Sequence, residues 1–187
     1  QIDAAGGKLH IGTEVESISQ DGDKVLLHSS DGHMEFDKVV IAAGTDSTGL
    51  ALTAGINLPQ RRSPGVVVKT NPLPSFIKNL STIYLPALSK EEKELHIRQS
   101  TDGVVMIGAG DQESEAEDDS QEYADKLVQR ASLHFIQLSG VDAIRVPVGF
   151  RPMPEDGLPV IGFSPANNNI YFTLMHSGVT LAPLVGA

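Results

Sequence analysis

Arg151 is the residue whose surroundings in this sequence most strongly indicate chemistry. It stands in the run GFRPMPEDGLPVIG at positions 149–162, where a short strand would deliver the arginine. A turn bounded by prolines, whose φ angles are fixed, would follow, and positions 160–162 would begin a second strand. The pattern predicts an arginine held at a strand end by a rigid turn.

The next stretch predicts a binding site made of backbone groups. Positions 170–175 read as a strand, and HSGVTLAP at 176–183 reads as a glycine-containing loop that opens a helix. The first N–H groups of a helix have no partner within it and lie at the positive end of its dipole. Such a junction is suited to an electron-rich ligand.

Together these stretches resemble the C-terminal signature of the D-amino-acid oxidase and glycine oxidase (DAO) family of FAD-dependent oxidoreductases. The pattern, Gly-x-Arg-Pro-x-x-x-Asp-Gly-x-Pro-x-Ile-Gly, matches in order and spacing through Gly162. FDKVVIAAG at 36–44 is similar to the family strand that returns beneath the cofactor. Pro64-Gly65 and GVVMIGA at 103–109 also lie where the family has similar segments. The resemblance covers nearly the whole chain.

The resemblance implies an α/β (α+β) fold, with an incomplete FAD-binding domain portion and an antiparallel-sheet substrate domain. Residues 1–57 would be the returning part of the FAD-binding domain, a β-meander and a buried strand. Residues 58–148 would be the substrate-binding domain, and 149–187 a C-terminal segment that contacts FAD. The implied cofactor-binding residues are Ala43, Gly44, Gly149, His176, Ser177, Gly178, Val179 and Thr180.

For the loop 176–180, the resemblance implies that backbone N–H groups stabilise negative charge at flavin N1 and C2=O during reduction. The alternative is that His176 only caps the following helix. For Arg151, the resemblance implies a catalytic role, a two-pronged salt bridge to the substrate carboxylate. The alternative is an ion pair with a nearby acid such as Asp156.

His96 and Arg98 are two positions apart on a predicted strand and share one face. By the resemblance, His96 falls where relatives carry an aromatic pocket residue, so it could shape substrate specificity. Arg98 could then bind a second acidic group. The alternative, a pair of solvated residues on an exposed face, is equally compatible with the sequence.

The implied function is FAD-dependent oxidation of an amino acid or secondary amine by hydride transfer to flavin N5, giving an imine that water hydrolyses. This needs orientation of the substrate more than a general base. One alternative is a non-catalytic domain, or a subunit completed by a separate ADP-binding chain. Another is a flavoenzyme that acts on an α-hydroxy acid or glycerol phosphate.

The sequence departs from the family pattern in two respects. The Gly-x-Gly-x-x-Gly fingerprint that would hold the FAD pyrophosphate is absent, and Met175 stands where relatives usually have glycine. The first residue is Gln1, which runs straight into a strand-like pattern. We expect a piece of a longer protein, whose parent binds FAD, while the piece alone neither retains FAD nor catalyses.

The elements that would position these residues follow from periodicity. Alternating apolar positions at Leu9 and Ile11, and a strand at 24–28 between Asp-Gly turns, predict the meander. The continuous apolar run 39–43 predicts a strand buried on both faces. A capped short helix should end near Gly55, and residues 59–65 should form a loop.

The middle of the chain predicts antiparallel strands and one helix. Strands are expected at 66–68, 83–85, 94–100 and 104–107. A helix is expected at 119–139, with Asp119 and Glu122 at capping-box spacing and an apolar stripe behind them. The acidic run 111–119 lacks the glycine and closing Glu of a calcium loop, so we assign it no metal site.

Composition limits the function classes. The net charge of −10 disfavours nucleic-acid binding, and no apolar run is long enough to span a bilayer. The absence of cysteine excludes disulfides, thiolate nucleophiles and zinc–thiolate sites in this chain, and it fits a cytoplasmic protein. By the family resemblance, the expected partner is a small molecule, an amino acid or amine.

Overall fold

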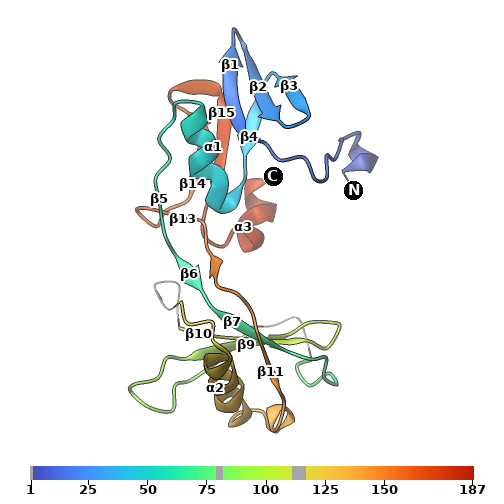
Figure 1. The fold of residues 1–187 in the computed structure, drawn as a ribbon, viewed down its shortest axis with the longest axis vertical. Helices are drawn as coiled ribbons and strands as arrows, with labels where there is room; N and C mark the ends of the chain where they lie inside the picture. The colour runs from blue at the N-terminus through green and yellow to red at the C-terminus, as the bar shows by residue number, and fades with distance from the viewer. Residues whose placement is uncertain (1, 79–81, 111–116) are drawn as a thin grey trace. The chain divides into compact units, whose positions relative to one another are not determined.

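The structure, a computed structural model, describes residues 2–78, 82–110 and 117–187. The chain divides into two compact units (Figure 1). The first unit comprises Gln1–Arg61 and Pro152–Ala187, and the second comprises Arg62–Arg151. Each unit has its own cluster of buried apolar side chains.

Among its described residues, the first unit carries two three-stranded sheets, a two-stranded sheet and two α-helices. In chain order its elements are η1 (Asp3–Ala5), β1 (Ser17–Asp21), β2 (Lys24–Ser29), β3 (Gly32–Phe36), β4 (Val39–Ile41), η2 (Gly44–Asp46), α1 (Ser47–Thr53), β5 (Gln60–Arg61), β13 (Met153–Pro154), β14 (Val160–Ser164), β15 (Asn167–Leu174) and α3 (Gly178–Val185).

Strands β1, β2 and β3 form an antiparallel meander, and β14, β15 and β4 form a second sheet. The turn between β1 and β2 begins at Gly22, whose φ of 58° is left-handed and suits glycine. In the second sheet β15 runs antiparallel to β14 and parallel to β4. Helix α1 packs against β1 and β4 (Figure 1). The apolar cluster of this unit includes Ile18, Val25, Ile41, Ala51, Ile170, Phe172 and Leu174.

Two sequence expectations for this unit are wrong. Leu9 and Ile11 are not in a strand, and their side chains are 62% and 85% exposed. The apolar run 39–43 gives a short strand that is not buried on both faces, because Val40 is 60% exposed between buried Val39 and Ile41. Within the described residues β4 has one partner strand, β15, so an apolar run alone did not determine how much of the strand is covered.

The second unit is an antiparallel sheet with one helix. Its elements are β6 (Pro64–Gly65), β7 (Val67–Thr70), β8 (Ile83–Leu85), β9 (Leu95–Gln99), β10 (Val105–Ala109), α2 (Gln121–Ser132), η3 (Ile136–Leu138), β11 (Ala143–Arg145) and β12 (Gly149–Phe150). The main sheet has the order β11-β7-β10-β9-β8, and every neighbouring pair is antiparallel. Residues 59–65, expected as a loop, contain β5 and β6, which pair with β13 and β12.

Helix α2 covers one face of this sheet. Ala124, Leu127, Val128 and Ala131 recur at helical spacing and are buried, together with Val68, Ile97, Val105 and Ile107 of the sheet. The opposite side of the helix is polar, with Lys126 2.8 Å from Glu122 one turn earlier. This side-chain pattern explains why the helix docks on one face only.

Helix α2 is shorter than the predicted 119–139 and has a different cap. Its N-cap is Ser120, whose Oγ accepts a hydrogen bond from the Tyr123 N–H at 3.1 Å. Asp119, expected as the cap, bonds elsewhere. The helix ends at Ser132, and buried Leu138 belongs to the separate turn η3. The acidic run 111–119 lies largely outside the described residues, so its expected solvated loop stays a prediction.

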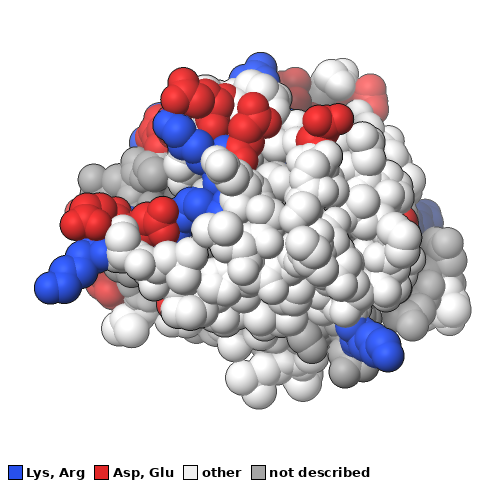
Figure 2. All heavy atoms as spheres, turned by 90° about the horizontal axis from the view of Figure 1, so that it is seen from below, with Lys and Arg blue, Asp and Glu red and all other residues white. Residues whose placement is uncertain are grey.

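Charge is unevenly distributed over the surface. Figure 2 views the α2 and β11 end of Figure 1 and shows a broad area without acidic or basic side chains, with charges toward its margins. Leu133 and Ile136, just after α2, are 68% and 77% exposed. No helix in the part of the chain that the structure describes is long and apolar enough to cross a membrane.

Candidate functional site

Successive side chains along each strand of the second unit's main sheet point to opposite faces. One face is apolar and lies under α2, and the other carries both polar and apolar side chains. We call the opposite side the open face, meaning the face of the second unit's main sheet that does not carry α2. Its residues are Val67 and Lys69 on β7, Tyr84 on β8, His96 and Arg98 on β9, and Met106 and Gly108 on β10.

His96 lies over a glycine on the neighbouring strand. Gly108 pairs directly with His96 across β9 and β10. A Cβ added to Gly108 would fall 2.3 Å from the His96 Nε2, so the imidazole occupies the space of a missing side chain. On the other side, the Tyr84 ring centroid is 6.3 Å from that of His96. The glycine therefore fixes where the ring can lie.

Arg151 is positioned by a second glycine in the same way. Its backbone N–H donates to the Ser63 carbonyl at 2.8 Å, next to the paired strands β6 and β12. Its Nη1 donates to the Pro64 carbonyl at 2.5 Å. A Cβ on Gly65 would be 2.8 Å from the Arg151 Nη2 and 2.9 Å from Cζ. The guanidinium thus lies flat on Gly65, and its remaining N–H donors are available to a planar anion.

His96 and the arginines interact electrostatically. Burial lowers the pKa of His96 from its ordinary value of 6.5, and the positive charges of Arg151 and Arg98 lower it further against the opposing effect of Glu94. The imidazole is therefore neutral near pH 7. The positive charge of this region is carried by the arginines.

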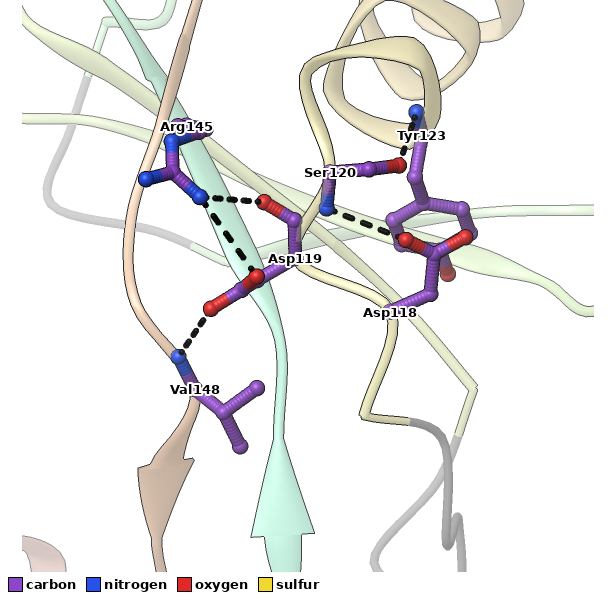
Figure 3. A network of polar contacts seen from close by, with 6 residues as sticks. All are labelled: Asp118, Asp119, Ser120, Tyr123, Arg145 and Val148. Carbon is purple, nitrogen blue, oxygen red and sulfur yellow. Dashed lines mark hydrogen bonds and ion pairs between the residues drawn. The ribbon is translucent and has the colours of Figure 1, made fainter.

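Asp119 holds the chain segment that leads to Arg151 (Figure 3). Its Oδ2 accepts a hydrogen bond from the Val148 N–H at 3.1 Å, and its Oδ1 is 3.6 Å from the Arg145 Nη1. Ser120 beside it caps α2. Asp119 therefore ties the start of the helix to the segment that leads through β12 to Arg151, three positions beyond Val148.

The first unit contains a pocket along one side of α3, where Gly178, Ala182 and Val185 of the helix line it. Its volume is about 470 Å³, and Gly44 and Gly178 both line it. Ser177 precedes the helix in the left-handed conformation, with φ 62°, and its side chain does not cap the helix. Instead the Ser177 Oγ is 2.6 Å from the His176 Nδ1. The N–H groups of Gly178, Val179 and Thr180 are therefore left without an intrahelical acceptor, whereas the Leu181 N–H donates to the Ser177 carbonyl at 3.0 Å.

The predicted cofactor residues are only partly brought together. Gly44 and Gly178 line the pocket at α3, whereas Ala43 lines a neighbouring cavity of about 790 Å³ with Val15 and Asp46. Ser177, Val179 and Thr180 are exposed in the same loop and helix start, and Val179 is 95% exposed. Gly149 is in β12 of the second unit.

These residues fit the pyrimidine end of a flavin in chemical terms. Unused N–H groups and the positive end of the α3 dipole favour an electron-rich ring edge. The glycines at 44 and 178 leave the pocket wall without side chains at those points. Among the described residues no group of three or more His, Asp or Glu could hold a metal ion.

The sequence did not assign a role to Gly65 or Gly108. Both lie in segments noted for the family resemblance, Pro64-Gly65 and GVVMIGA. A glycine inside a predicted strand often marks a close approach by another group, but Gly65 falls in the predicted loop 59–65 and Gly108 just after the predicted strand 104–107, so this signal was not present. Asp156, the alternative partner for Arg151, accepts a hydrogen bond from the Leu158 N–H at 2.9 Å within its own turn.

Comparisons with known proteins agree with this architecture. The sequence model of the DAO family, described as FAD dependent oxidoreductase, matches residues 1–187. The B subunit of opine oxidase from Agrobacterium tumefaciens is 31% identical over 146 residues, 78% of this chain and 36% of the relative. Glycine oxidase of Pseudomonas aeruginosa is 26% identical over 180 residues, 94% of this chain and 47% of the relative.

A solved structure shows the same fold. The crystal structure of glycine oxidase from Geobacillus kaustophilus matches 98% of this chain and 48% of its own, with a TM-score of 0.75 and 24% sequence identity. The predicted fold class and family resemblance are thereby confirmed. The chain spans less than half the length of the curated relatives it matches.

Proposed function

The chain belongs to the DAO family of FAD dependent oxidoreductases, and we propose that its full-length protein oxidises an amino acid or a secondary amine. Residues 58–148 would form the substrate-binding domain, and 1–57 and 149–187 would belong to the FAD-binding side. The division of the chain between Arg61 and Arg62, and between Arg151 and Pro152, supports this arrangement.

Arg151 is the observation that carries the proposal. Its guanidinium is anchored by the Pro64 carbonyl over Gly65, beside the open face that holds His96. An arginine with a fixed plane binds a carboxylate through two parallel hydrogen bonds, which sets the direction of the α-C–H bond. We therefore assign Arg151 as the catalytic residue that clamps the substrate carboxylate, and His96 as a pocket wall that stays neutral.

Bound FAD would supply the chemistry, accepting a hydride from the substrate α-carbon at N5 and leaving an imine for hydrolysis. The chain's own contribution is orientation and charge. Backbone N–H groups at Gly178, Val179 and Thr180 would face the electron-rich pyrimidine edge, with Gly44 across the pocket. His176 would hold Ser177 in its left-handed conformation through the Oγ–Nδ1 contact.

The test is substitution of Arg151 in the full-length flavoprotein. Arg151→Ala should leave FAD bound and the fold intact while kcat/KM for flavin reduction by an amino acid falls tens- to thousands-fold. A buried, charge-assisted pair is worth about 2–5 kcal/mol, which corresponds to that range. Arg151→Lys should recover little, because a point charge does not fix the carboxylate plane. Anaerobic stopped-flow absorbance measures the reduction directly.

Two controls make the result specific. Lys126→Ala, on the exposed side of α2, should change neither flavin content nor rate. An amine substrate without a carboxylate should respond far less to Arg151→Ala than an amino acid does. If Arg151→Ala reduces flavin as fast as wild type, or if it unfolds the protein, Arg151 is a structural residue and the assignment is wrong.

A second candidate function is a subunit that needs a separate ADP-binding chain. The similarity to the B subunit of an opine oxidase favours it. Copurification of a flavin-bearing partner chain would support it. The choice of substrate distinguishes the proposed amine oxidation from a flavoenzyme that acts on an α-hydroxy acid or glycerol phosphate. Such an enzyme would reduce its flavin with the hydroxy compound and not with the amine.

A further inference from the structure

Two further cations lie in one row across the open face. Met106 on β10 pairs with Lys69 on β7 on one side and with Arg98 on β9 on the other. All three side chains project from the same face as His96, which precedes Arg98 by two positions. The row therefore places a lysine and an arginine on either side of one methionine.

Neither cation is neutralised by an acid within the described residues. Arg98 is exposed, and its Nη2 contacts the Met106 sulfur at 3.1 Å, a weak acceptor. No described carboxylate lies within ion-pair distance of Lys69 or Arg98.

The other arginines of this sheet and helix behave differently. Arg62 pairs with Glu117 at 3.0 Å, Arg130 lies 3.4 Å from Glu92, and Arg145 lies 3.6 Å from Asp119. The chain has 24 acids for 14 bases, so unpaired cations are not the expected state of its surface. Arg98 and Lys69 therefore form a positive site that has no counter-charge among residues 2–78, 82–110 and 117–187.

The spacing relates this site to Arg151. Gly65, under the Arg151 guanidinium, and Lys69 are four residues apart on adjoining strand segments, about 13 Å at the usual rise of a strand. Because the side chains of Lys69 and Arg98 are long, their charged ends can lie closer to the Arg151 guanidinium than the backbone spacing indicates. His96 lies between, over Gly108. A molecule with anions at both ends fits this line of groups, and one with a single anion uses only Arg151.

We propose that Lys69 and Arg98 bind a second carboxylate of the substrate, so that the preferred substrates are amino acids or secondary amines with two carboxylates. The inference rests on the proposed oxidation and on Arg151 as the clamp for the first carboxylate. The physical basis is that a carboxylate satisfies the two cations, whereas the isosteric amide brings no charge to them. Glu94, the acid that immediately precedes β9, lies beyond His96 on the side away from Lys69.

The experiment compares matched substrate pairs in the full-length flavoprotein. Glutamate and glutamine, in both enantiomers, and N-(2-carboxyethyl)glycine and N-(2-carbamoylethyl)glycine differ in one carboxylate. We expect kcat/KM for flavin reduction to favour the dicarboxylate at least tenfold in wild type. Arg98→Gln and Lys69→Gln should each reduce this ratio, and the double variant should bring it close to one. Lys126→Gln, on α2, should leave the ratio unchanged.

A charge reversal gives an independent readout. Arg98→Glu should shift the preference toward amino acids with a cationic side chain, for which lysine is the probe. Equal rates for carboxylate and amide in wild type, or a preference that survives the double variant, would overturn the second-carboxylate site while the proposed oxidation stands. If no amine or amino acid of either class reduces the flavin, the proposed function fails and this inference fails with it.

Discussion

Gly65 contributes to the proposed site because it lacks a side chain. The Arg151 guanidinium lies where its Cβ would be, at 2.8 Å from Nη2. Gly65→Ala should displace this flexible side-chain end without unfolding the sheet, and kcat/KM for amino acid should fall about 10- to 100-fold, as for other small misplacements of catalytic groups. Stopped-flow flavin reduction measures the change.

A double variant separates this effect from general damage. If Gly65 acts through Arg151, Gly65→Ala should have little further effect in the Arg151→Ala background, because the two substitutions remove one interaction. Additive losses in the double variant would show that Gly65 acts through some other contact.

His96 should make the protein less stable in mild acid. Its pKa is lowered in the folded protein, by burial first and then by Arg151 and Arg98, with Glu94 opposing and Tyr84 alongside. The unfolded chain then binds more protons as pH falls below 6.5, so the free energy of unfolding decreases until the folded pKa is passed. Urea unfolding at pH 7.5 and 5.5 should show a larger loss for wild type than for His96→Gln. An equal or smaller loss for wild type would contradict this assignment.

At the scale of elements, Asp119 connects helix α2 to the strand that carries Arg151. Its Oδ2 bond to the Val148 N–H is partly buried. Asp119→Ala should lower the free energy of unfolding by about 1.5–3 kcal/mol, the usual worth of a hydrogen bond to a charged group. It should also lower kcat/KM, because the segment before Arg151 loses its anchor. Chemical unfolding and flavin reduction measure the two effects.

The matched comparison is Glu122→Ala on the same helix. Its carboxylate forms an exposed pair with Lys126, which is worth about 0.3–0.5 kcal/mol. Glu122→Ala should therefore change stability little and leave kcat/KM as it was. If Asp119→Ala is as mild as Glu122→Ala, the Asp119 contacts do not anchor the Arg151 segment.

Local pattern predicted most elements of the fold but not their environment. Strands β8, β9 and β10 and the stripe of α2 followed from alternation and helical spacing. The exposure of Val40 was not predicted. An apolar run indicates that a strand is suited to burial, but it does not indicate which neighbouring elements cover the strand. The cap at Ser120 was missed because Asp119, next to it, serves a contact 29 positions away.

For the candidate site, the sequence indicated some of the residues but not the glycines that make room for them. Arg151, His96 and the loop at His176 were proposed from motif, spacing and family resemblance, and their roles stay predictions. The roles of Gly65 and Gly108 were not proposed, since a glycine that admits a distant side chain has no periodic signal. Long-range packing of this kind is visible only once the strands are paired.

At the scale of the whole molecule, the prediction concerns whether residues 1–187 retain FAD without the rest of the protein. In the proposed function, the α3 N-terminus and the pocket at Gly44 and Gly178 would bind one edge of a flavin through a few backbone N–H groups. Much of the affinity for FAD in such enzymes comes from binding of its pyrophosphate at a glycine-rich helix start, and this sequence has no Gly-x-Gly-x-x-Gly run.

Residues 1–187 purified alone should therefore be colourless, whereas the full-length protein should be yellow. Visible absorbance per mole of protein, with and without added FAD followed by gel filtration, measures this. A stoichiometric flavin spectrum retained by residues 1–187 would mean that the contacts at α3 and Gly44 suffice to hold the cofactor without the pyrophosphate site.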